Sequence, residues 1–126
     1  VNVVQSQLVG SHPQDLVVAF GSHIGARAYL VDLLNGSAVA PFSEEIFFRG
    51  LIFGGLARRM PVAAAAVLSS LLFALLHGIS VVAPIFLLGL GLAYVYRRTG
   101  SVWASMSTHG LVNLISVTLL FALPRP

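Results

Sequence analysis

Long apolar stretches, separated by short polar or glycine-containing breaks, dominate this chain and predict an all-α fold. The four clearest stretches of helical length cover residues 42–59, 61–77, 81–98 and 102–123. Pro41 suits a first helical turn, Gly78 and Pro124 suit helix ends, and Ser101 suits a helix start. At a rise of about 1.5 Å per residue, such stretches cross or nearly cross a bilayer core. The pattern therefore predicts four core helices in a multi-pass transmembrane bundle.

A further helix is predicted over residues 15–34, where apolar residues recur at helical spacing between Asp15 and Gly36. Arg27 and Asp32 argue against a simple spanning helix, so an amphipathic helix at the interface and a partly inserted helix both remain open. No signal peptide is expected over residues 1–14. We divide the chain into an N-terminal tail and helix, residues 1–36, and one membrane domain, residues 37–126.

The composition favours a membrane protein and argues against nucleic-acid binding. The 126 residues are 57% apolar and only 9% charged, with a mean hydropathy of +0.93, which is too apolar for an ordinary soluble domain of this size. The basic residues are seven scattered arginines without lysine, so a nucleic-acid partner is not expected. Cysteine is absent, which excludes disulfides, thiolate zinc sites and cysteine nucleophiles.

The arginines predict an orientation. Arg58 and Arg59 lie between the first and second core helices, and Arg97 and Arg98 lie between the third and fourth. Only Arg125 falls on the opposite side. The positive-inside rule places the side with the two arginine pairs in the cytoplasm. We therefore predict a multi-pass integral protein, located in the bacterial cytoplasmic membrane.

Ionisable residues gather in three short groups within the apolar stretches, and the first group is Glu44 and Glu45 with Arg49. Residues four apart share a helix face, so Glu45 and Arg49 can pair. That pair is either a device that only neutralises charge or part of a site. One arginine does not comfortably neutralise two carboxylates, and a buried, uncompensated Glu44 would be poised for proton transfer.

The other two groups are Phe73 with His77 and His109 with Asn113, each one helical turn apart. Taken singly, a helix-end histidine usually bonds a backbone carbonyl, and a histidine with an asparagine often links two helices. Such polar groups on three helices of an apolar chain favour a shared site instead. Glu44 and His77 lie near the same membrane face if their helices are antiparallel.

The residues that other classes of intramembrane protease require are absent from this sequence. The sequence contains neither His-Glu-x-x-His nor Gly-x-Ser-Gly, and both aspartates, Asp15 and Asp32, lie in the uncertain N-terminal helix. These absences argue against the usual zinc protease, the serine type and the aspartyl type. A glutamate with histidines remains as the candidate chemistry.

The three groups resemble the motifs of the CPBP family, the CAAX-protease and bacteriocin-processing membrane proteins, also called the Abi or type II CAAX prenyl endopeptidase family. The family motifs are Glu-Glu-x-x-x-Arg, Phe-x-x-x-His and His-x-x-x-Asn/Asp. They correspond to EEIFFR over residues 44–49, FALLH over 73–77 and HGLVN over 109–113, in the expected order. The resemblance covers roughly residues 40–123.

This resemblance implies an intramembrane endopeptidase acting on membrane-associated, prenylated (CAAX-type) or bacteriocin-like peptides. Glu44 and His77 would activate a water molecule, and His109 and Asn113 would stabilise the oxyanion. No cofactor is favoured. If zinc is used, Glu44, His77 and His109 are the residues that would hold it.

By the same resemblance, Glu45 and Arg49 would balance charge beside the working carboxyl, and Phe73 would fix the rotamer of His77. The expected partners are a peptide or lipidated-protein substrate and the lipid bilayer. Two other functions remain open: a non-catalytic membrane immunity or scaffold protein that keeps the polar groups for folding, and a small proton-linked transporter. Four short helices leave little room for the alternating access of a transporter.

Overall fold

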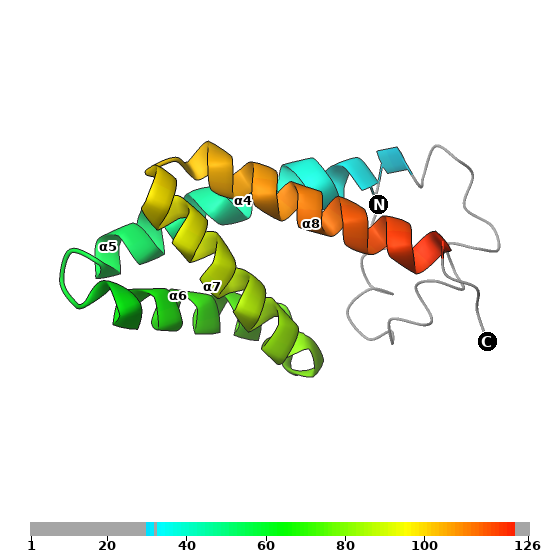
Figure 1. Cartoon of the computed structure of the whole chain (residues 1–126). Coiled ribbons are helices and arrows are strands. Elements are labelled where there is room, and N and C mark those ends of the chain that lie inside the picture. Colours follow the sequence, from blue (N-terminus) through cyan, green and yellow to red (C-terminus); the bar gives the residue numbers. More distant parts are fainter. Residues whose placement is uncertain (1–29, 32, 123–126) are drawn as a thin grey trace.

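The computed structural model describes residues 30, 31 and 33–122, and this part of the chain forms an all-α bundle without strands (Figure 1). The elements in chain order are the π-helical η1 (Asn35–Val39), α4 (Ala40–Glu45), the π-helical η2 (Ile46–Phe53), α5 (Gly54–Leu56), α6 (Val62–Leu76), the 3-10 turn η3 (Ile79–Val81), α7 (Val82–Thr99) and α8 (Val102–Ala122). The predicted fold class is confirmed. Most of the predicted helix over residues 15–34 lies outside the described residues.

The elements η1, α4, η2 and α5 form one continuous helix, so the predicted helix end at Gly36 and the new start near residue 42 are wrong. The residues at each junction have right-handed helical φ and ψ angles. A wide turn leads into Pro41, because the N–H of Ala40 bonds the carbonyl of Asn35, five residues back. Pro41 has no N–H to donate. The carbonyl of Gly36, five residues before it, instead accepts a 2.8 Å hydrogen bond from the side chain of Asn113 in α8.

The later helix boundaries agree with the sequence pattern. Gly78 has a φ of 106° after the end of α6, and Gly100 ends α7 in the left-handed conformation with a φ of 66°. The hydroxyl of Ser101 accepts the N–H of Ala104 at 3.4 Å, as expected of a helix cap. The predicted spans 61–77 and 81–98 each differ from α6 and α7 by one residue at either end, and the predicted start at residue 102 agrees with α8. Residue 123 lies outside the described residues.

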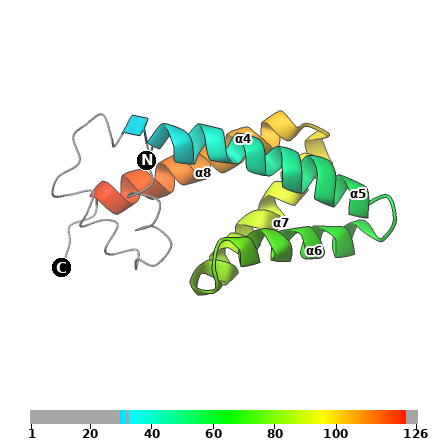
Figure 2. The ribbon, with the colours of Figure 1, turned by 180° about the vertical axis from the view of Figure 1, so that it is seen from behind.

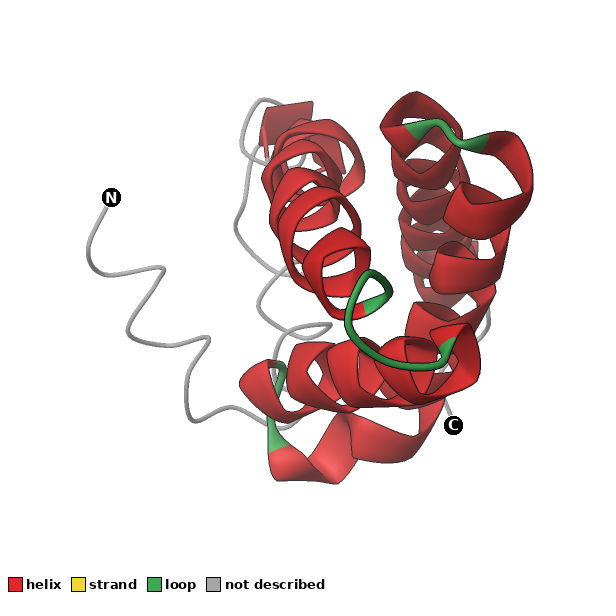
Figure 3. Cartoon of the chain, turned by 90° about the vertical axis from the view of Figure 1, so that its left-hand side faces the viewer, coloured by secondary structure: helices red, strands yellow, loops and turns green. Residues whose placement is uncertain are grey.

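Two helix pairs make up the bundle. Viewed from behind, the continuous first helix runs beside α8, while α6 and α7 pair below them (Figure 2). Figure 3 shows the same arrangement from the end where the turn between α5 and α6 lies. The α6 and α7 backbones approach closely at Gly89, where an added Cβ would lie 2.9 Å from the Cβ of Ser70. A glycine therefore sets the distance between these two helices.

The outer surface of the bundle is strongly apolar. One helix among the described residues, Ile79–Thr99, is long and apolar enough to cross a membrane, and Val62–Leu76 is a shorter apolar helix. Large side chains more than 60% exposed include Leu51, Leu76, Ile79, Leu87 and Trp103. Apolar surface of this extent marks a face that meets lipid or protein. The number of crossings remains a prediction.

The close approach at Gly89 yields a paired test with Gly91, a glycine of the same helix with open space around it. Gly89→Ala is expected to lower the free energy of unfolding by about 1–3 kcal/mol, because the new methyl group overpacks against Ser70. Gly91→Ala is expected to raise it by up to about 1 kcal/mol through helix propensity. Denaturant unfolding in detergent micelles measures both, and equal stabilities would contradict the close contact.

The bond from Asn113 to Gly36 yields a double-mutant cycle with Pro41. Asn113→Ala is expected to cost about 1–3 kcal/mol in the wild-type background, because it leaves a carbonyl unpaired. In a Pro41→Ala background the new backbone N–H can serve that carbonyl, so the same substitution should cost less. Unfolding of the four proteins gives the coupling free energy. A coupling of zero would show that proline and asparagine act independently.

Candidate active site

The carboxylate of Glu45 is fully buried at the end of α4 and has polar partners on both oxygens. Its Oε2 lies 3.2 Å from Nε of Arg49 and accepts a 2.5 Å hydrogen bond from the hydroxyl of Ser105 in α8. Its Oε1 lies 3.0 Å from Nδ1 of His109, also in α8. A charge removed from water is tolerable only with such partners, so this network binds the first helix to α8.

The guanidinium of Arg49 joins the same network to the other helix pair. Arg49 is 1% exposed, and its Nη2 donates a 3.0 Å hydrogen bond to the carbonyl of Gly89 in α7. Its Cζ lies 4.7 Å from the ring centroid of Phe73 in α6, a cation–π distance. Arg49 therefore contacts α6 and α7 while it neutralises Glu45.

The neighbouring carboxylate, Glu44, faces two histidines. Its Oε2 lies 3.8 Å from Nε2 of His77, at the end of α6, and 3.8 Å from Nε2 of His109. The side chains of Glu44 and His77 are 28% and 31% exposed, whereas that of His109 is 3% exposed. The structure thus brings together three of the predicted site residues at a place that is open on one side.

Hydrogen bonds determine which ring nitrogen of each histidine carries a proton. Nδ1 of His77 lies 2.7 Å from the carbonyl of Phe73, and a carbonyl can only accept, so this nitrogen donates. The Nδ1 of His109 donates in the same way to Glu45. In the neutral rings, both Nε2 atoms therefore turn a lone pair toward Glu44. Three acceptors that face one another in this way suit a hydrogen-bond donor, such as a water molecule, between them.

Phe73 is the aromatic centre of the site. It is completely buried, and its ring centroid lies 4.4 Å from that of His77, 5.7 Å from that of His109 and 5.0 Å from that of Phe48. These contacts limit the rotation of both imidazoles. The ring therefore holds the two histidines in place relative to Glu44.

Zinc requires donors that converge on a common point at about 2 Å. Glu44, His77 and His109 are suitable donor types, but the described residues contain no group of three such side chains spaced to hold a metal ion. Zinc binding by these three residues stays a prediction. The zinc alternative therefore enters no step of the mechanism below.

The side-chain amide of Asn113 is not directed to Glu44 in this structure, because it donates a hydrogen bond to the carbonyl of Gly36. A role as an oxyanion donor would require that bond to open. The sequence analysis missed Ser105 as a site residue, although it lies four residues before His109 on the same face of α8. That spacing was the available signal.

An all-α bundle with ionisable side chains enclosed between apolar helices defines a helical membrane-type protein with a polar interior site. The chain belongs to the type II CAAX prenyl endopeptidase Rce1-like family, whose model matches residues 26–115. The resemblance inferred from the three motifs is therefore confirmed.

Two bacterial relatives are similar to this chain. The "Putative membrane peptidase YdiL" of Bacillus subtilis is 30% identical over 88 residues, which are 69% of this chain and 36% of that protein. The "UPF0177 protein YxdF" of Lactococcus lactis subsp. lactis is 30% identical over 116 residues, 90% of this chain and 63% of that protein. The chain thus covers about a third of the length of the first relative and less than two thirds of the length of the second. No solved structure matches it.

The Glu45 network predicts a large penalty for removing its cation. Arg49→Met is expected to lower the free energy of unfolding by about 3–5 kcal/mol, because it leaves a buried carboxylate without its counter-charge. Adding Glu45→Met to this variant should recover much of the loss, since neither charge is then buried. Denaturant unfolding in micelles measures both, with Arg59→Met at the exposed turn as control. A neutral Arg49→Met would contradict the network.

Proposed function

We propose that this chain forms the core of a multi-pass membrane endopeptidase that hydrolyses peptide bonds in membrane-associated peptides, of the prenylated CAAX type or the bacteriocin type. The observation that carries the proposal is the convergence of Glu44, His77 and His109. Family membership and the peptidase name of one relative support it. The bacterial sources of both relatives agree with a bacterial cytoplasmic membrane.

The nucleophile in this proposal is a water molecule. The 3.8 Å separation between Glu44 Oε2 and His77 Nε2 is too long for a direct hydrogen bond and suits a water that donates to both atoms. Glu44 would take a proton from this water as its oxygen attacks the scissile carbonyl. The proton would then pass from Glu44 to the leaving amine.

Charge that develops on the carbonyl oxygen needs a donor nearby. A protonated His109 can donate from Nε2, and the adjacent carboxylate of Glu45, 3.0 Å from Nδ1, would stabilise its positive charge. Asn113 is the proposed second donor, once its amide leaves the carbonyl of Gly36. Arg49 and Phe73 act as positioning residues through their contacts with Glu45 and the histidines.

Access to the site suits a substrate held at the membrane. Glu44 and His77 are partly exposed while His109 lies beneath them, so a peptide can approach from one side. The surrounding helices expose apolar side chains, such as Ile46 and Leu76, that a lipid anchor on the substrate can contact. A lipidated or hydrophobic peptide would therefore arrive with its scissile bond near the glutamate.

A non-catalytic immunity or scaffold protein is the second candidate. The observation that favours it is that both oxygens of Glu45 have polar partners within the chain and need no substrate. Under this alternative, Glu44→Gln would leave function intact, whereas loss of Arg49 would destabilise the bundle. The two proposals thus differ on the accessible glutamate.

Cleavage of defined peptides tests the enzyme proposal. The purified chain in detergent is incubated with a farnesylated CAAX peptide and with the same peptide lacking the lipid, and products are identified by mass spectrometry. Glu44→Gln and His77→Ala are each expected to slow cleavage by about 10²–10⁴-fold, because each removes a group that handles the proton. The matched control is Ser43→Ala, which changes an exposed side chain one residue before the glutamate and is expected to keep the wild-type rate.

Melting temperatures of all variants separate lost chemistry from lost folding. Cleavage that survives a zinc chelator but fails in both site variants supports the glutamate mechanism. Cleavage abolished by the chelator would replace it with a metal mechanism. A folded wild type without activity on either peptide would favour the scaffold alternative.

A further inference from the structure

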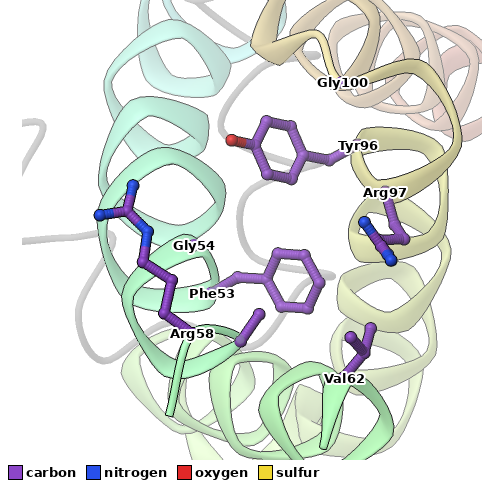
Figure 4. Close-up of a pocket in the computed structure, with 8 residues that line it drawn as sticks. Phe53, Gly54, Arg58, Val62, Tyr96, Arg97 and Gly100 are labelled. Carbon is purple, nitrogen blue, oxygen red and sulfur yellow. The ribbon is translucent and has the colours of Figure 1, made fainter. Parts of the chain in front are cut away.

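A cavity lies at the end of the bundle where the chain turns from α5 into α6 and where α7 ends (Figure 4). It has a volume of about 340 Å³. The residues that line it are Phe53, Gly54, Ala57, Arg58, Val62, Tyr96, Arg97 and Gly100. Glu44, His77 and His109 do not contribute to it, so this cavity is separate from the candidate active site.

The lining combines positive charge with an apolar wall. Arg58 and Arg97 come from opposite sides, while the ring of Phe53 lies between them and the hydroxyl of Tyr96 points across the opening (Figure 4). No carboxylate is among the lining residues. Among the described residues these two arginines have no acidic partner. Positive charge on both sides and a hydroxyl donor make the lining complementary to an anion.

The N-terminal end of α6 adds positive partial charge to the same cavity. Val62, its first residue, lines the cavity, and neither a side-chain cap nor an acidic residue lies at this end of the helix. The first N–H groups of a helix carry partial positive charge and suit an anionic ligand. Backbone and side chains therefore favour the same sign of ligand.

Helix-end charge compensation explains only part of this arrangement. Arg97 and Arg98 both occupy the last turn of α7, where a cation offsets the negative end of the helix dipole. That effect does not require a hollow. One member of each arginine pair, Arg58 and Arg97, lines the cavity, whereas Arg59 and Arg98 do not.

We propose that this cavity binds the phosphate-bearing headgroup of an anionic phospholipid. Arg58 and Arg97 would contact the phosphate, Tyr96 would donate to an oxygen of the lipid, and Phe53 and Val62 would contact its apolar part. The arginine pairs place this end at the cytoplasmic leaflet, where anionic headgroups lie. The inference rests on the proposed membrane insertion but not on proteolysis.

Titration of the detergent-purified chain with short-chain phosphatidylglycerol, read by native mass spectrometry, tests the proposal. The double variant Arg58→Gln with Arg97→Gln is expected to bind about thirtyfold more weakly, or about fivefold for each arginine lost. The control is Arg59→Gln with Arg98→Gln, which removes the same charge from the same two turns. It is expected to keep the wild-type affinity.

Three results would overturn the proposal. Equal binding of phosphatidylcholine and phosphatidylglycerol would remove the requirement for an anionic lipid. Equal weakening in both double variants would reduce the effect to general surface charge. Inorganic phosphate that binds in an Arg58- and Arg97-dependent manner, without binding of the lipid, would assign the cavity to a free phosphate. Lipid binding can succeed or fail independently of peptide cleavage, so this test is separate from that of the active site.

Discussion

The carboxylate of Glu45 has no access to water, and the rest of the bundle is arranged to satisfy it. Arg49 supplies the opposite charge, and Ser105 and His109 supply donors from α8. Arg49 in turn reaches the carbonyl of Gly89 in α7. Because an unpaired buried charge costs several kcal/mol, these contacts hold three helices at fixed positions around one carboxylate.

Two adjacent glutamates have opposite environments for a simple geometric reason. Consecutive residues of a helix point about 100° apart, so Glu45 faces the interior of the bundle while Glu44 lies near its surface, 28% exposed. The buried glutamate orients His109 through Nδ1, which leaves Nε2 of the same ring toward Glu44. The buried carboxylate of Glu45 therefore orients a histidine that faces the accessible carboxylate of Glu44, and His109 contacts both glutamates.

The bundle carries different chemistry in two places. Acidic and imidazole groups converge around Phe73, whereas the end formed by the α5–α6 turn and the end of α7 carries arginines and an apolar cluster of Phe53, Ala65 and Ala93. A chain of the type II CAAX prenyl endopeptidase Rce1-like family thus combines a candidate proton-transfer site with a separate anion-complementary cavity. The outer surface of the bundle exposes large apolar side chains, which suits a lipid environment.

The sequence by itself determined the all-α class, the limits of α6 and α7, the start of α8 and the three polar groups. Helix periodicity, glycine conformation and i,i+4 spacing are local properties. Only the tertiary structure decided that the first helix continues past Pro41, since the carbonyl left free there is satisfied by Asn113, 77 residues away. It also decided the role of Ser105 and the formation of the arginine-lined cavity. The separation of the helices, set at Gly89 by contact with Ser70, depends on packing between segments and cannot be derived from either segment alone.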